Sequence, residues 1–181
     1  MKSVSWRTAA LVACCATTAF AARQEMNEYE WKSRFLYNVC VYAEWPAAAF
    51  AANDSPIVIG IVGKDPFGES MTKIFGENTA QKRKIEIKKF DAVKNIKDCH
   101  ILFLPATEKE NLAAALAKLK GTNTLLIGES EGLGAKGAVL NLLIEDKQKV
   151  KVEFNADAAE RAGIKLSSKL VKLTKPVQDE K

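Results

Sequence analysis

The sequence predicts an α/β fold, namely a mostly parallel sheet flanked by helices, with a C-terminal antiparallel hairpin and a terminal helix. Short, continuous apolar runs typical of buried strands recur along the chain, and segments with helical spacing of apolar residues lie between them. This alternation implies parallel strands with helices on both faces of the sheet. Near the C-terminus two strand-like segments follow each other across a short charged turn, which favours antiparallel pairing.

The first half of the chain supplies a helix and the first strands. Apolar and aromatic residues recur mostly every three or four positions over residues 25–41, which predicts an amphipathic helix that ends before Trp45-Pro46. Residues 57–62 are a continuous, mostly β-branched run, as expected of a strand buried on both faces. A helix and two further strands are then predicted at residues 67–75, 84–90 and 101–105.

The second half contains the clearest helix, residues 108–120. Its leucines share one face, its acidic residues lie near the start and its lysines near the end, and Gly121 follows as a stop signal. A core strand and a glycine-containing loop come next, and they are followed by the hairpin strands, a short helix and the terminal helix. The core strand is predicted at residues 125–128 and the loop at residues 129–137. The hairpin strands are predicted at residues 139–144 and 150–155, the short helix at residues 156–163 and the terminal helix at residues 164–173.

The first 21 residues have the features of a secretory signal peptide. Lys2 and Arg7 form a basic start, a stretch of small apolar residues follows, and Ala19-Phe20-Ala21 is a small-x-small cleavage site. Cleavage near Ala21 would leave residues 22–181 as a single domain outside the cytoplasm. Lipidation of Cys14 and an uncleaved anchor are the alternatives, although the apolar run is shorter than the about 20 residues that a spanning helix needs.

The charge pattern disfavours nucleic acid as a partner. Removing residues 1–21 takes away Lys2 and Arg7 and no acidic residue, which lowers the formal net charge from +5 to +3. The remaining lysines interleave with acidic residues and do not form one basic stripe.

His100 is the only histidine, and no residue spacing indicates a metal site or a nucleophile with its base, so we expect neither a cofactor nor an enzyme.

The segment Gly63-Lys64-Asp65-Pro66-Phe67-Gly68 lies between a predicted strand and a predicted helix. Nucleotide-binding folds hold phosphate at this place, but the segment lacks the Gly-Lys-Ser/Thr of a P-loop. A structural turn is the first interpretation. A crevice for a small ligand at the strand ends is the second, because doubly wound sheets bind ligands there. Its candidate residues are Asp65, Pro66, Phe67, Gly68 and Glu129.

Several stretches, in order along the mature chain, resemble the YfiR-like family of exported bacterial proteins. They are Phe35-Leu36-Tyr37-Asn38, Glu44-Trp45-Pro46, residues 57–63 with Asp65-Pro66-Phe67-Gly68, Cys99-His100-Ile101-Leu102-Phe103, Leu126-Ile127-Gly128-Glu129, Val152-Glu153-Phe154-Asn155 and residues 163–170. The resemblance implies a periplasmic, non-enzymatic repressor that binds the periplasmic sensor domain of an inner-membrane diguanylate cyclase and lowers cyclic di-GMP output. A periplasmic small-molecule sensor or carrier is the alternative function.

The resemblance also implies homodimers and disulfide bonds, and here the sequence departs from the family. Gly60 stands where we expect a cysteine near the first core strand, whereas Cys99 matches a family cysteine. Cys40 is the other cysteine of the mature chain, so Cys40–Cys99 is the candidate disulfide. Two buried thiols are the alternative.

Aromatic residues gather in and just after the first predicted helix. Aromatic side chains are enriched at protein interfaces, so Phe35, Tyr37, Tyr42 and Trp45 are the candidate partner-binding residues. The alternative is that they pack the first helix onto the sheet.

Overall fold

The structure is a computed structural model that describes residues 27–76, 78–146 and 149–180. The predicted signal peptide, its cleavage site near Ala21 and the lipidation alternative at Cys14 lie outside the described residues.

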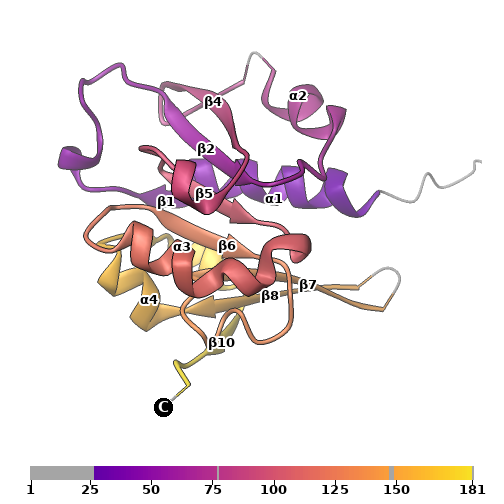
Figure 1. Ribbon diagram of the computed structural model, residues 1–181. Coiled ribbons are helices and arrows are strands. Elements are labelled where there is room, and N and C mark those ends of the chain that lie inside the picture. The colour runs from indigo at the N-terminus through magenta and orange to yellow at the C-terminus, as the bar shows by residue number, and fades with distance from the viewer. Residues whose placement is uncertain (1–26, 77, 147–148, 181) are drawn as a thin grey trace, which may run out of the picture.

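One eight-stranded sheet runs through the molecule in the order β10-β8-β7-β6-β5-β2-β4-β3 (Figure 1). Its strands are β2 (Ile57–Val62), β3 (Thr79–Ala80), β4 (Arg83–Phe90), β5 (Ile101–Leu104), β6 (Leu125–Gly128), β7 (Leu140–Asp146), β8 (Lys149–Asn155) and β10 (Lys175–Val177). Strands β4, β2, β5, β6 and β7 are parallel, and β7 and β8 form an antiparallel pair. The mostly parallel sheet and the C-terminal hairpin are therefore confirmed. The parallel order is that of a doubly wound fold whose chain reverses direction across the sheet between β2 and β5.

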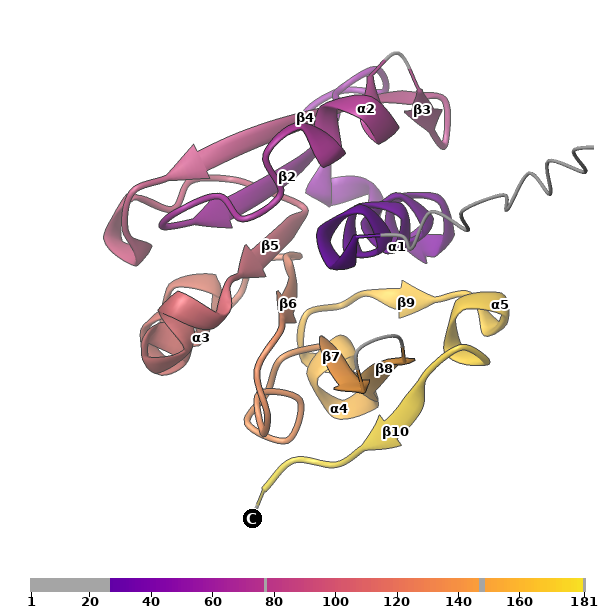
Figure 2. The same ribbon diagram turned by 90° about the vertical axis from the view of Figure 1, so that its right-hand side faces the viewer.

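Helices cover both faces of this sheet, and α1 and α3 lie on opposite sides of β5 (Figure 2). The helices are α1 (Glu28–Tyr42), α2 (Glu69–Phe75), α3 (Leu112–Leu119), α4 (Ala156–Arg161) and α5 (Ser168–Val171), with short 3-10 segments at Ala47–Ala49, Val93–Asn95 and Ala106–Asn111. Each face has its own apolar cluster: one includes side chains of α1, α2 and α4, and the other includes side chains of α3.

Helix α1 begins where Asn27 accepts a hydrogen bond from the Tyr29 N–H, and it ends at an extended Ala43. The predicted helix over residues 108–120 is α-helical only from Leu112, because the preceding turn, Ala106–Asn111, has 3-10 geometry. A 3-10 turn is a common start for an α-helix.

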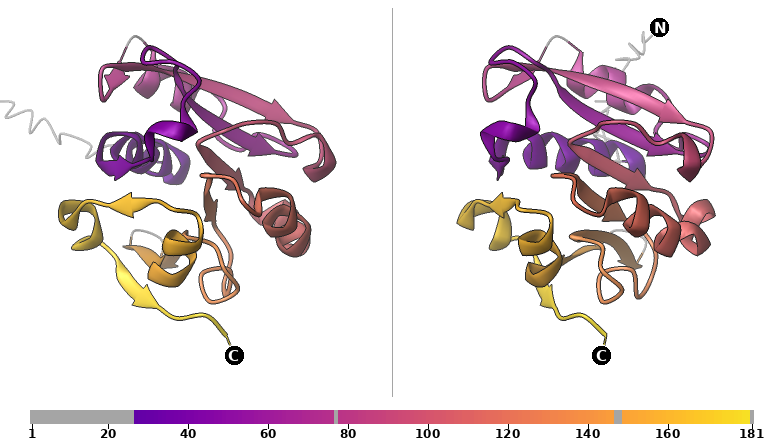
Figure 3. Two further views of the ribbon diagram at one scale, coloured as in Figure 1. Left: turned by 90° about the vertical axis from the view of Figure 1, so that its left-hand side faces the viewer. Right: turned by 60° about the vertical axis from the view of Figure 1, so that its left-hand side comes forward.

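The terminal helix predicted over residues 164–173 is wrong in extent. Lys165–Leu166 form β9, which pairs antiparallel with β1 (Ala43–Glu44), and only Ser168–Val171 are α-helical. Strand β10 then pairs parallel to β8 at the sheet edge, where the left view of Figure 3 shows the C-terminal segment. Pairing with distant strands overrides the apolar spacing that suggested a helix.

The two thiols of the described chain are both free, and they lie on opposite faces of the sheet. Cys40 is fully buried in the cluster that includes α1, whereas Cys99 is 8% exposed in the cluster that includes α3. Burial is the main cause that raises the pKa of each thiol to about 12. The candidate Cys40–Cys99 bond is therefore not formed, and the alternative of two buried thiols describes the fold.

Gly60 lies directly beside Cys99. A Cβ added to Gly60 would be 3.3 Å from the Cys99 Sγ and 2.6 Å from Phe90 Cε2, so the Phe90 ring must shift for any side chain to fit. The position where a family cysteine was expected is thus the one that faces Cys99.

We predict that Gly60→Cys forms a disulfide with Cys99 under mild oxidation, because the new side chain would start within reach of the Cys99 sulfur. Closing a loop of about 40 residues should make the oxidised variant up to about 4 kcal/mol more stable than its reduced form, less any strain from moving Phe90. Thiol titration and urea unfolding with and without reductant measure both effects. Gly60→Ser is the matched control, and an oxidised Gly60→Cys that keeps both thiols free would contradict the geometry.

Candidate functional site

The predicted crevice residues follow β2 and β6 at the carboxyl edge of the parallel strands, where the side chains of Phe67 and Glu129 are buried. Phe67 is 3% exposed and packs edge-on against Phe103 of β5, with ring centroids 4.7 Å apart. Tyr29 of α1 packs against Phe67 at 5.4 Å. Asp65 accepts a hydrogen bond from the Phe67 N–H and pairs with Lys89 at 2.7 Å. Asp65, Pro66 and Gly68 belong to the turn that brings Phe67 into this contact.

Lys32 of α1 and Glu129, which directly follows β6, form a buried ion pair at this edge. Each side chain is 2% exposed, and Lys32 Nζ lies 2.6 Å from Glu129 Oε2. Lys32 also pairs with Glu28, while Glu129 Oε1 accepts the Ala106 N–H at 2.8 Å. One carboxylate thus joins α1, β6 and the segment after β5.

The surroundings of the ion pair act on Tyr29 as well. Its hydroxyl lies 3.4 Å from Glu129 Oε1, and its ring lies under the Lys32 ammonium. Burial, followed by the charges of Glu129 and Glu28, raises the pKa of Tyr29 to about 12. Glu129 is therefore a structural residue in this conformation, with its oxygens already occupied by protein groups.

Sequence reasoning missed Lys32, although a signal was present. Lys32 lies three and four positions before Phe35 and Leu36, which places a lysine on the apolar stripe of the helix. A lysine that is fully buried is almost always paired. Pairing this signal with Glu129 would have required knowledge of the sheet order.

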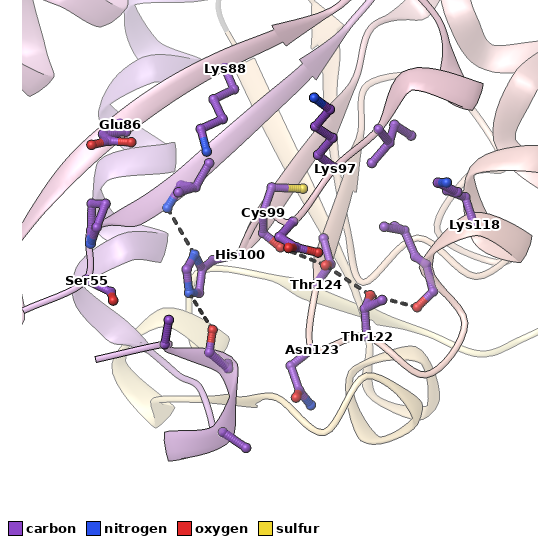
Figure 4. A pocket seen from close by; sticks show the side chains of 18 residues that line it. Ser55, Glu86, Lys88, Lys97, Cys99, His100, Lys118, Thr122, Asn123 and Thr124 are labelled. Carbon is purple, nitrogen blue, oxygen red and sulfur yellow. Dashed lines mark hydrogen bonds between the residues drawn. The ribbon is translucent and has the colours of Figure 1, made fainter. Parts of the chain in front are cut away.

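An open cavity of about 740 Å³ lies at the opposite, amino edge of the strands (Figure 4). We call it the amino-edge pocket. It is walled by the segment that follows α1, by β4, by the turn before β5 and by the turn between α3 and β6. Its lining residues include Val58, Lys88, Lys97, Cys99, His100, Lys118 and Thr124. None of these positions was predicted as a ligand site.

His100 anchors one wall of the amino-edge pocket. Its Nδ1 accepts the Val58 N–H at 3.0 Å, so the neutral ring carries its proton on Nε2, which donates to the Ala49 carbonyl at 3.1 Å. The ring stacks on Phe50 at 4.4 Å, and the Trp45 indole N–H donates to the His100 carbonyl. Burial is the largest cause that lowers the pKa of His100, and the charges of Arg83 and Lys88 lower it further.

A family model described as YfiR/HmsC-like matches residues 29–175. The chain belongs to the YfiR/HmsC-like family. No curated protein matches this chain. Among solved structures, a conserved domain protein from Vibrio cholerae O1 biovar El Tor str. N16961 is similar, with 13% sequence identity and a TM-score of 0.48. The match covers 68% of this chain and 55% of the solved chain.

In this YfiR/HmsC-like chain the candidate partner-binding aromatics differ in exposure. Phe35 is 4% exposed and belongs to the core, stacked on Trp31. Tyr37 and Trp45 are half-buried, and their polar atoms donate to the carbonyls of Thr79 and His100. Tyr42 is also half-buried, with the Lys169 ammonium 6.0 Å from its ring centroid. Packing of α1 therefore explains Phe35, while the other three side chains keep exposed surface.

No group of three or more histidine, cysteine, aspartate and glutamate residues in the described ranges is arranged to hold a metal ion. No helix among residues 27–76, 78–146 and 149–180 is long and apolar enough to cross a membrane.

We predict that Lys32→Met lowers the free energy of unfolding by about 3–5 kcal/mol, because it leaves the Glu129 carboxylate buried without its cation. The double variant Lys32→Met/Glu129→Leu should lose less than the sum of the single variants, which urea unfolding measures. Arg34→Met is the matched control: it breaks the exposed i,i+4 pair with Glu30 and should cost less than about 1 kcal/mol. Equal losses for Lys32→Met and Arg34→Met would contradict the buried pair.

We predict that this protein loses stability as the pH falls below about 6.5, the ordinary histidine pKa. Because folding lowers the pKa of His100, the unfolded chain binds a proton first, and the contribution of the neutral ring is lost between pH 6.5 and the lowered folded pKa. His100→Asn keeps an acceptor for the Val58 N–H without titrating. Urea unfolding across this pH range should give the variant a shallower slope, and identical slopes would exclude His100 as the cause.

Proposed function

We propose that this protein is a periplasmic regulatory subunit that binds the sensor domain of an inner-membrane diguanylate cyclase and holds the enzyme inactive. The observation that carries the proposal is the YfiR/HmsC-like match over residues 29–175. That family implies a periplasmic regulator of diguanylate cyclases. The N-terminal signal-peptide pattern supports the same compartment.

Repression of this kind is a shift between two states of the cyclase. A bound subunit changes activity only to the extent that it binds the inactive state more tightly than the active state. We propose Tyr42, at the C-terminal end of α1, as a contact for such binding. Its side chain is half-buried, and its hydroxyl has no hydrogen-bond partner within the described residues.

We predict that the mature, exported protein retains a diguanylate cyclase from solubilised inner membranes and that deleting its gene raises cellular cyclic di-GMP. Tyr42→Ala should weaken retention about tenfold if this residue is a hot spot of the interface. Quantitative pull-down and cyclic di-GMP measurement provide the two readouts.

Lys73→Ala, at a side chain that is 74% exposed on α2, is the control and should retain the cyclase like the wild type. Recovery of no membrane partner, together with unchanged cyclic di-GMP after deletion of the gene, would contradict the proposal. Normal retention by Tyr42→Ala with raised cyclic di-GMP after deletion would keep the function and move the interface away from α1.

A further inference from the structure

The amino-edge pocket has a basic rim. Lys88 of β4, Lys97 before β5 and Lys118 of α3 come from three separate elements and line the same cavity (Figure 4). All three side chains are exposed, and within the described residues none forms an ion pair with a carboxylate. Lysines placed this way keep their charge available to a ligand.

A second hollow of about 830 Å³ extends this basic rim. It shares the three rim lysines with the amino-edge pocket and adds Lys94, together with Lys89, which is already paired with Asp65. The carboxylates Glu86 and Asp98 also line the amino-edge pocket, and Asp91 lines the second hollow. Four unpaired lysines against three carboxylates leave an excess of positive charge across the two hollows, so an anion is the favoured occupant.

The floor of the amino-edge pocket is different in character from its rim. Val58, Ile96 and Leu119 supply apolar surface, and the buried Cys99 also lines the cavity. The Thr124 hydroxyl donates to the Cys99 carbonyl, so its hydrogen is already used. An apolar floor beneath charged groups is typical of sites for small organic ligands, and about 740 Å³ is within the usual range of their volumes.

The location of this pocket follows from the closure of the opposite edge. Doubly wound sheets bind ligands at the carboxyl ends of their strands, but here Phe67, Tyr29 and the Lys32–Glu129 pair fill that edge. On the amino side, α3 covers β5 and β6, whereas Glu86 and Lys88 of β4 face the open cavity. The hollow is therefore a gap in the helical layer of one face.

We propose that the amino-edge pocket binds a small amphiphilic anion, with an apolar body on the floor and a phosphate or carboxylate among Lys88, Lys97 and Lys118. The site is independent of the proposed function, since it requires no cyclase and involves none of the candidate partner-binding residues.

Nitrogen-15 NMR titration of the mature protein with phenyl phosphate tests the proposal, with benzyl alcohol as the neutral counterpart of similar shape. Saturable shifts of the Cys99, His100 and Thr124 amides with phenyl phosphate, and none with benzyl alcohol, are the expected result. The affinity should fall as salt is added, because the attraction is screened.

The variant Lys97→Gln/Lys118→Gln should weaken phenyl phosphate binding about fivefold, given the modest strength of exposed charge pairs. Lys165→Gln/Lys172→Gln removes the same charge from exposed positions outside the pocket and should bind like the wild type. An absence of saturable shifts at the pocket amides, or equal affinity in both double variants, would overturn the proposal.

The source of the anionic group is distinguished by sedimentation with phosphatidylglycerol vesicles. Binding to vesicles that phenyl phosphate displaces would identify a lipid headgroup as the natural anion. Phenyl phosphate binding without vesicle binding would identify a soluble molecule. Either outcome leaves the cyclase interaction to be judged by its own pull-down experiment.

Discussion

The ion pair between Lys32 and Glu129 is the constraint on which the arrangement of this protein depends. It joins the first helix to the end of β6 through groups that are almost fully removed from water, and the Ala106 N–H ties the segment after β5 to the same carboxylate. Two buried charges are costly unless both are paired and hydrogen-bonded, which is the case here. The pair therefore fixes α1 across the carboxyl edge and turns the usual ligand site of the fold into core.

Strands β2, β5 and β6 could be predicted from the sequence because each is a short apolar run buried on both faces, as in Ile57–Val62 and Leu125–Gly128. The C-terminal segment could not. Its apolar residues fit a helix by spacing, but the Ser167 N–H bonds to the Tyr42 carbonyl, and Lys165–Leu166 pair with β1. Such contacts join distant parts of the chain, so local periodicity does not contain them.

The candidate site was predictable only in part, for a similar reason. The sequence placed Phe67 and Glu129 at one edge, since residues after parallel strands share that edge, but it gave no sign that Lys32 closes it. The amino-edge pocket combines residues from separate segments of the chain that are individually ordinary, such as Lys88 and Lys118. Its charge becomes visible only when the sheet order brings those segments together.

The two ends of the sheet also bear on self-association. Outermost β10 contains Pro176, which lacks a backbone N–H. At the other end, the two-residue β3 pairs only with Arg83 and Lys84, and the rest of β4 carries Lys88 and Lys89. Proline and lysine on outer strands discourage a second chain from adding to a sheet. A homodimer of this protein would therefore join through helices and loops, and the sheet would stop at the boundary of each subunit.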